Sequence, residues 1–215
     1  MRVHVLFVLL GLAMVGTAAG PARAVVIDFE GLANGENAGN VLAASGVTFA
    51  TGSIPNVLTP TITFTPLSAS FDVLNPNICS ISGTACALAH LGGTNDLLMS
   101  FSTPVTSLRL TSDDAPGEAP DVIRLLALAA TGTPNQFTLL ASTDGLDNAT
   151  TSPGNQLTVT NGGLPFSFAL FQTTTEQEGF DDLTFSPTPE PITLLLWGTT
   201  MAGLGLAGWR RRRPQ

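Results

Sequence analysis

Residues 122–130 read Val-Ile-Arg-Leu-Leu-Ala-Leu-Ala-Ala, and Thr-Gly-Thr-Pro-Asn at 131–135 separates them from Gln-Phe-Thr-Leu-Leu at 136–140. Residues 122–130 are apolar except for Arg124, and such a nearly continuous apolar run is typical of a strand in the middle of a sheet. The Gly, Pro and Asn at 131–135 favour a turn. The stretch therefore predicts two consecutive strands joined by a short turn.

Further short strands are expected on both sides of this pair, because Phe and β-branched residues suit pleated, packed surfaces. They cover residues 25–30, 46–50, 61–64, 97–101, 105–110, 157–160, 165–171 and 180–185. Clusters of Gly, Pro, Asn and Ser separate them, and neither a helix nor an internal repeat is evident before the C-terminal region. This pattern predicts an all-β fold, a jelly-roll-like antiparallel β-sandwich.

The N-terminal segment, residues 1–24, has the features of a secretory signal peptide. Arg2 supplies a positive charge, and an apolar run over 3–15 follows, interrupted only by His4. Ala22-Arg23-Ala24 matches the small-x-small cleavage pattern, so we expect Val25 to be the mature N-terminus. The alternative is an uncleaved anchor, which the short apolar run disfavours.

The C-terminal region combines an apolar span with a basic end. Residues 192–209 carry no charge, and as a helix they extend about 27 Å, close to the thickness of a bilayer core. The span is followed by Arg210, Arg211, Arg212 and Arg213. By the positive-inside rule these arginines predict a transmembrane helix whose C-terminal end, residues 210–215, is cytoplasmic. A buried core helix is the alternative, but four successive arginines would have to leave the core at once.

A proline-rich segment, residues 187–191, precedes the span. Its prolines fix φ and lack N–H donors, which keeps the segment extended and accessible to a processing enzyme. The order Pro189-Glu190-Pro191, apolar span, arginine cluster resembles the PEP-CTERM sorting signal of Gram-negative bacteria, with Thr188 where many members have Val. The resemblance covers 189–213 and implies an exosortase, a membrane protease, as partner. It also implies transient or stable inner-membrane anchoring with the domain in the periplasm, then transfer to the cell surface, often beside exopolysaccharide. The alternative is a plain linker.

The remaining segment, residues 25–186, has a one-sided charge. It holds all of the 16 acidic residues except Glu190, but only Arg109 and Arg124 of the 8 basic ones. Such a surface repels nucleic acid and anionic lipid, and it suits cations or neutral partners such as polysaccharide. Solubility outside the cell explains the same charge.

Two cysteines, Cys79 and Cys86, enclose a short loop with Gly83 at its centre. Export places them in an oxidising compartment, so we expect a disulfide between them. Two free buried thiols are the alternative.

The segment carries no catalytic motif. His90 is its only histidine, and no nucleophile elbow, HExxH, phosphate-binding loop or dinucleotide fingerprint occurs. The sequence therefore favours a non-enzymatic surface or matrix protein with a structural or adhesive role. An exported glycan-acting hydrolase is the alternative. The segment also lacks Trp and Tyr, whose faces commonly bind sugars, so a structural role is preferred.

A second resemblance concerns the two ends of the segment. Residues 27–32, 46–49 and 179–185 are similar to the first and last strands of exported jelly-roll domains, including PEP-CTERM ectodomains and carbohydrate-binding modules. Such domains place their first and last strands near each other, with Leu183 and Phe185 inward. Four carboxylates would then converge: Asp28, Glu30, Asp181 and Asp182. Ca²⁺ would relieve their repulsion, so a calcium site is a hypothesis. The alternative is that the carboxylates spread into solvent.

Overall fold

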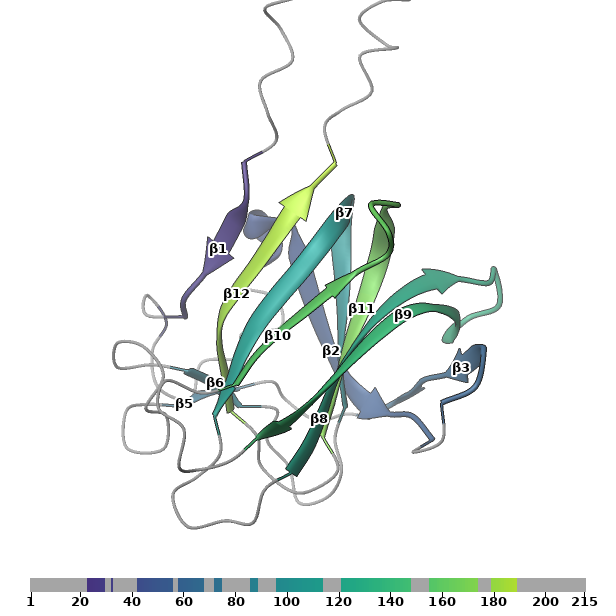
Figure 1. Cartoon of the computed structure of the whole chain (residues 1–215), viewed down its shortest axis with the longest axis horizontal. Helices are drawn as coiled ribbons and strands as arrows, with labels where there is room; N and C mark the ends of the chain where they lie inside the picture. The colour runs from purple at the N-terminus through teal and green to yellow at the C-terminus, as the bar shows by residue number, and fades with distance from the viewer. Residues whose placement is uncertain are drawn as a thin grey trace, which may run out of the picture. The chain divides into compact units, whose positions relative to one another are not determined.

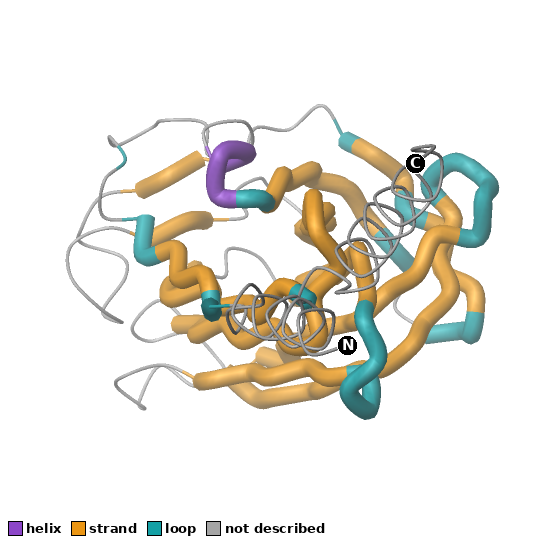
Figure 2. Tube along the Cα trace, turned by 90° about the horizontal axis from the view of Figure 1, so that it is seen from above, coloured by secondary structure: helices purple, strands orange, loops and turns teal. Residues whose placement is uncertain are grey.

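Strands make up most of the part of the chain that the computed structural model describes (Figures 1 and 2). The described residues are 23–29, 32, 42–55, 58–67, 72–74, 86–88, 96–113, 121–147, 155–173 and 179–188. They belong to one unit, Arg23–Thr188, which we call the folded unit. The other unit, Met1–Ala22 with Pro189–Gln215, lies outside the described residues.

All strand pairs in the described residues are antiparallel, and a 3-10 helix, η1 (Leu42–Ser45), is the one helical segment among them. The predicted all-β fold is confirmed. The strands are β1 (Val25–Ile27), β2 (Val47–Ser53), β3 (Thr61–Thr63), β4 (Thr65–Pro66), β5 (Asp72–Leu74), β6 (Cys86–Leu88), β7 (Asp96–Asp113), β8 (Asp121–Ala130), β9 (Gln136–Asp147), β10 (Asn155–Thr160), β11 (Phe166–Thr173) and β12 (Gly179–Pro187). The strands β4, β5 and β6 were not predicted from the sequence, because they are too short to show alternation.

The long strand β7 connects two layers of a sandwich. Its first part pairs with β2 and β11, and its second part pairs with β10 and β12. Beyond β11 the first layer continues through β8 and β9 to β3. In the second layer, β1 and β6 pair with different parts of the edge of β12 that faces away from β7, and β5 follows β6 (Figure 1).

Two of the predicted segments form a single strand in the structure. The sequence leads from 97–101 through Pro104 into 105–110, and β7 is continuous over both segments. The exposed Pro104 lies where β7 changes partners: Val47 pairs with Phe101, and Val105 pairs with Phe166. A missing N–H is tolerated there because no ladder hydrogen bond depends on it.

The burial of both faces of β8 explains why its sequence is continuously apolar. Ile123, Leu125 and Ala127 belong to the core between the layers. Leu126 and Leu128 belong to a second apolar cluster on the opposite face of the first layer. The prediction that residues 122–130 form an interior strand is confirmed, since β8 lies between β9 and β11.

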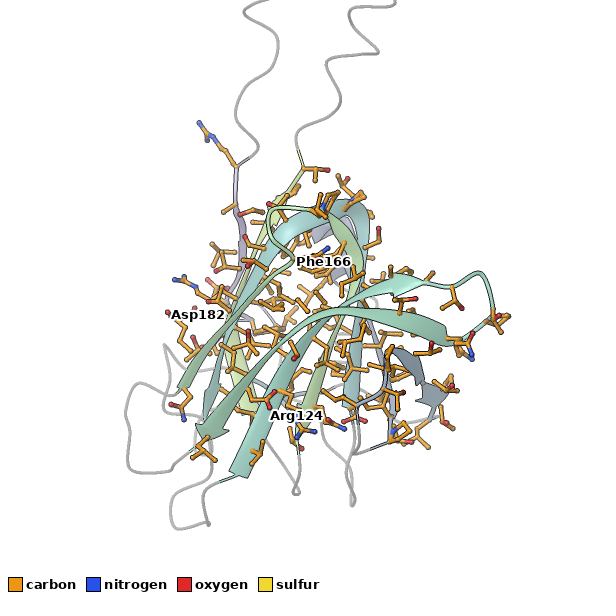
Figure 3. All side chains as sticks on the ribbon, turned by 45° about the vertical axis from the view of Figure 1, so that its right-hand side comes forward. Arg124, Phe166 and Asp182 are labelled. Atoms are coloured by element: carbon orange, nitrogen blue, oxygen red, sulfur yellow. The ribbon has the colours of Figure 1, made fainter. Side chains whose placement is uncertain are left out.

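Aromatic side chains join the two layers. The ring of Phe101 on β7 lies 6.4 Å, centroid to centroid, from Phe166 on β11 and 5.1 Å from Phe185 on β12. Phe166 is labelled in Figure 3 among the side chains of this core. Contacts of this kind contribute beyond the area they bury, so these residues help fix β12 against the rest of the unit.

Candidate functional site

The first and last strands of the folded unit lie side by side, as predicted. Val25 pairs with Phe185, Val26 with Thr184 and Ile27 with Leu183 (Figure 1). Leu183 and Phe185 are buried, which confirms their predicted inward orientation. The strand β1 is shorter than the predicted 25–30 because Phe29 has a positive φ of 57°, which an extended strand does not permit.

The carboxylates predicted to converge here differ in their surroundings. Asp181 is fully buried, and its Oδ1 accepts a hydrogen bond of 2.7 Å from the backbone N–H of Asp182. Asp182 is half-buried, Asp28 directly follows β1, and Glu30 lies outside the described residues. Within the described ranges, no group of three or more His, Cys, Asp or Glu residues is placed to hold a metal ion. With Glu30 undescribed, the four-carboxylate calcium site stays a prediction.

A hollow of about 210 Å³ adjoins β1. Its lining is mostly apolar: Val26, Ile27, Asp28, Phe29, Leu32, Leu42 and Ser45. Asp28 is its one charged lining residue among the described side chains, so the hollow offers little polar chemistry for recognising a ligand.

Asp182 occupies a β-bulge. Asp181 pairs with Thr111 and Thr184 with Arg109, so β12 has one extra residue there, and Asp182 has a φ of 50°. Asp and Asn tolerate this left-handed conformation, whereas β-branched residues do not. The adjacent Asp181 and Asp182 differ in burial because successive strand residues point to opposite faces, and burial alternates from 181 to 185.

We expect Asp182→Val to lower the free energy of unfolding by about 1–2 kcal/mol, because it forces a β-branched residue into the left-handed region. Asp182→Asn removes the charge, but Asn also tolerates the left-handed conformation, so this variant should lose less stability than Asp182→Val. Urea denaturation measures both. Thr184→Val, on the same strand without a positive φ, is the control. Equal losses in Asp182→Val and Asp182→Asn would show that the charge, and not the backbone, matters at this position.

The other predicted sites fall outside the described residues. They are the sorting motif Pro189, Glu190 and Pro191, the arginines Arg210, Arg211, Arg212 and Arg213, and Cys79 of the predicted disulfide. Cys86 begins β6 and pairs in register with Leu74. No helix among the described residues is long and apolar enough to cross a membrane, and the predicted span 192–209 is not among them.

A row of polar side chains that was not predicted from the sequence crosses the outer face of the first layer. We define the polar row as Asp96 on β7, Gln172 on β11, Arg124 on β8 and Asp144 on β9. Arg124 pairs in register with both Gln172 and Asp144. Arg124 Nη1 donates a hydrogen bond of 3.3 Å to Gln172 Oε1, and its Nε lies 3.5 Å from Asp144 Oδ2.

Asp96 is the most deeply buried carboxyl of the polar row, with 2% of its surface exposed. Its Oδ2 accepts a hydrogen bond of 2.5 Å from Ile54 N–H, and its Oδ1 has no hydrogen bond from the described residues. Burial raises the pKa of Asp96 from 3.8 to about 7, against the lowering effects of the Ile54 N–H and the nearby Gln172 amide. The arrangement therefore contains a carboxyl that binds and releases a proton near neutral pH.

The polar row is poorly placed for catalysis. A general acid or base must reach its substrate, and the two groups at the Asp96 end, Asp96 and Gln172, are almost completely buried. Arg124 was the available signal in the sequence, because a single charge inside an apolar strand requires polar partners. Gln172 comes from a strand distant in sequence, and Asp144 lies in the part of β9 beyond the predicted residues 136–140, so the sequence alone did not identify them.

No protein-family model and no curated protein sequence matches the chain. Among solved structures, the K2 cleaved adhesin domain of Lys-gingipain is similar, with 13% identity and a TM-score of 0.48, covering 76% of this chain and 99% of that one. The C-terminal family 22 carbohydrate-binding module of Clostridium thermocellum Xyn10B gives 10% identity and a TM-score of 0.43, covering 79% and 94%. The family 11 carbohydrate-binding module of Clostridium thermocellum gives 8% and 0.41, covering 79% and 98%. Similarity at this level transfers neither a ligand nor an activity to this chain.

Proposed function

We propose that this protein is an exported, non-enzymatic β-sandwich with a structural or adhesive role at the cell surface or in the extracellular matrix. Its signal peptide, residues 1–24, directs export, and the predicted helix at 192–209 holds it in the inner membrane. The segment Pro189-Glu190-Pro191 is then read by an exosortase-type protease. The folded unit is a jelly-roll-like domain that acts beside exopolysaccharide.

The observation that carries this proposal is the position of the ends of the folded unit. It runs from Arg23 to Thr188, whereas the sequence predicts signal cleavage after Ala24 and a sorting motif from Pro189. The last described residue, Thr188, is still attached to the unit, since its N–H donates a hydrogen bond of 2.8 Å to Pro104 O. Processing at both predicted sites would leave every described strand in place.

The structural or adhesive role is preferred to the alternative, an exported glycan-acting hydrolase. The sequence lacks a nucleophile motif, and the carboxyl with the raised pKa is buried away from any substrate. The folded unit also has no Trp or Tyr to stack on sugar rings, so we place polysaccharide association behind a structural role.

The test of this proposal is the substitution Glu190→Ala in the full chain, expressed in a Gram-negative host that has an exosortase. We expect the variant to accumulate at full length in the inner membrane, because the protease no longer recognises the motif. Immunoblots of membrane and culture fractions measure this, with Glu176→Ala as the matched control. If Glu190→Ala were trimmed and released like the control, Pro189–Pro191 would be only a linker.

A further inference from the structure

The outer face of the first layer carries the second apolar cluster, which would face solvent without a cover. Its sheet residues include Leu98, Leu126 and Leu170, all nearly or completely buried. Four side chains from the chain between β2 and β4 lie against them: Ile54, Leu58, Ile62 and Phe64. We call these four side chains the cover.

Backbone hydrogen bonds attach the cover to β9 and to the turn that precedes β9. Phe64 N–H donates to Asn135 O at 2.8 Å, and Leu139 N–H donates to Pro60 O at 2.9 Å. At the other end, Ile54 N–H donates to the carboxylate oxygen Oδ2 of Asp96. Of the hydrogen bonds described above for the backbone of the cover, this one has a titratable group as its acceptor.

The surroundings of Asp96 offer little compensation for a negative charge. On β2 its register partner is Gly52, and the ring of Phe64 occupies the space above that glycine. On β11 the neutral amide of Gln172 lies nearby. The charged groups on the same face are Arg124 on β8, which is engaged with Gln172, and Asp144 on β9, which forms an ion pair with Arg124. Among the described side chains, the rest of the cover adds no titratable group.

We propose that protonated Asp96 keeps the cover closed, and that ionisation of Asp96 loosens the cover and exposes the apolar cluster beneath it. A buried carboxylate regains hydration only if water reaches it. The strands β7, β8 and β11 are held by continuous ladders and by packing on both faces, so moving them would disrupt two cores. The cover is attached by the short ladders of β3 with β9 and of β4 with β2 and by single hydrogen bonds, so it opens at lower cost.

The raised pKa of Asp96 agrees with this proposal, since burial disfavours the charged form of Asp96 more than the hydrogen bond from Ile54 favours it. The cover is therefore expected to be closed in mildly acidic surroundings and looser above neutral pH. An apolar face that opens with pH would let a surface protein change its self-association or its contacts with a matrix without unfolding.

Hydrogen exchange measured by mass spectrometry on the purified chain between pH 5.5 and 8.5 tests the proposal. After correction for intrinsic exchange rates, we expect protection of peptides spanning 58–67 to fall at least about tenfold around pH 7. Peptides from β8 and β11 should stay protected throughout. The Asp96→Asn variant, which is neutral at every pH, should show no such fall.

The matched control is Asp144→Asn, which removes the exposed carboxyl of the polar row and should keep the transition. A transition that persists in Asp96→Asn would overturn the proposal. So would loss of protection in β8 and β11 together with 58–67, because the change would then be global. If Asp96→Asn does not fold, the wild-type comparison of 58–67 with β8 and β11 still decides the question.

Discussion

Asp96→Asn is expected to raise the free energy of unfolding at pH 8 by up to about 4 kcal/mol. The substitution keeps the shape of the side chain and an acceptor for Ile54 N–H, but it removes the charge that wild-type protein must bury. The magnitude follows from the difference between the ordinary pKa of 3.8 and the folded-state pKa of about 7. Because opening of the cover relieves part of this cost, the figure is an upper bound.

The pH dependence gives the sign of this effect. The folded-state pKa of Asp96 is higher than the unfolded one, so the folded protein binds more protons between pH 3.8 and about 7. The stabilisation by Asp96 is present below pH 3.8 and is lost as the pH rises to about 7. The gap between variant and wild type should therefore widen over this window and stay constant above it.

Urea denaturation at several pH values measures the gap, and Asp144→Asn is the control. Asp144 is exposed, so that variant should change stability by less than about 1 kcal/mol at each pH. A gap between Asp96→Asn and wild type that does not depend on pH would show that Asp96 does not titrate in this range.

Gly52→Ala is expected to lower the free energy of unfolding by about 3 kcal/mol, at the upper end of the range for overpacked cores. A Cβ at Gly52 would lie 2.6 Å from both Phe64 Cε2 and the backbone oxygen of Thr65, and still closer to Phe64 Cζ. The ring of Phe64 is completely buried and Thr65 O belongs to the backbone of β4, so neither can move aside without displacing the cover.

Gly145→Ala is the matched control for this substitution. Its Cβ would meet Leu157 Cδ2 at 2.8 Å, which is the end of a flexible side chain, and its other neighbours lie at 3.5 Å or beyond. We expect a loss below about 1.5 kcal/mol. Thermal and urea denaturation of both variants measure the difference. Equal losses would mean that Phe64 does not lie fixed against Gly52.

The all-β fold could be predicted because its signals are local. Apolar alternation, β-branched residues and turn-forming clusters each act over a few residues, and the interior position of β8 follows from its apolar run. The pairing of β1 with β12, expected from a resemblance, agrees with the structure. Secretion, membrane anchoring and sorting by residues 1–24 and 187–215 rest on local sequence patterns alone and stay predictions.

The polar row and the cover could be identified only from the tertiary structure. The polar row takes one side chain from each of four strands, β7, β8, β9 and β11, and only the register of those strands places the four side chains on one face. The bulge at Asp182 and the continuity of β7 through Pro104 likewise depend on pairing with other strands. A one-residue change of register would move each of these side chains to the opposite face. Composition and local patterns do not determine register, because it is set by the packing of the whole sandwich.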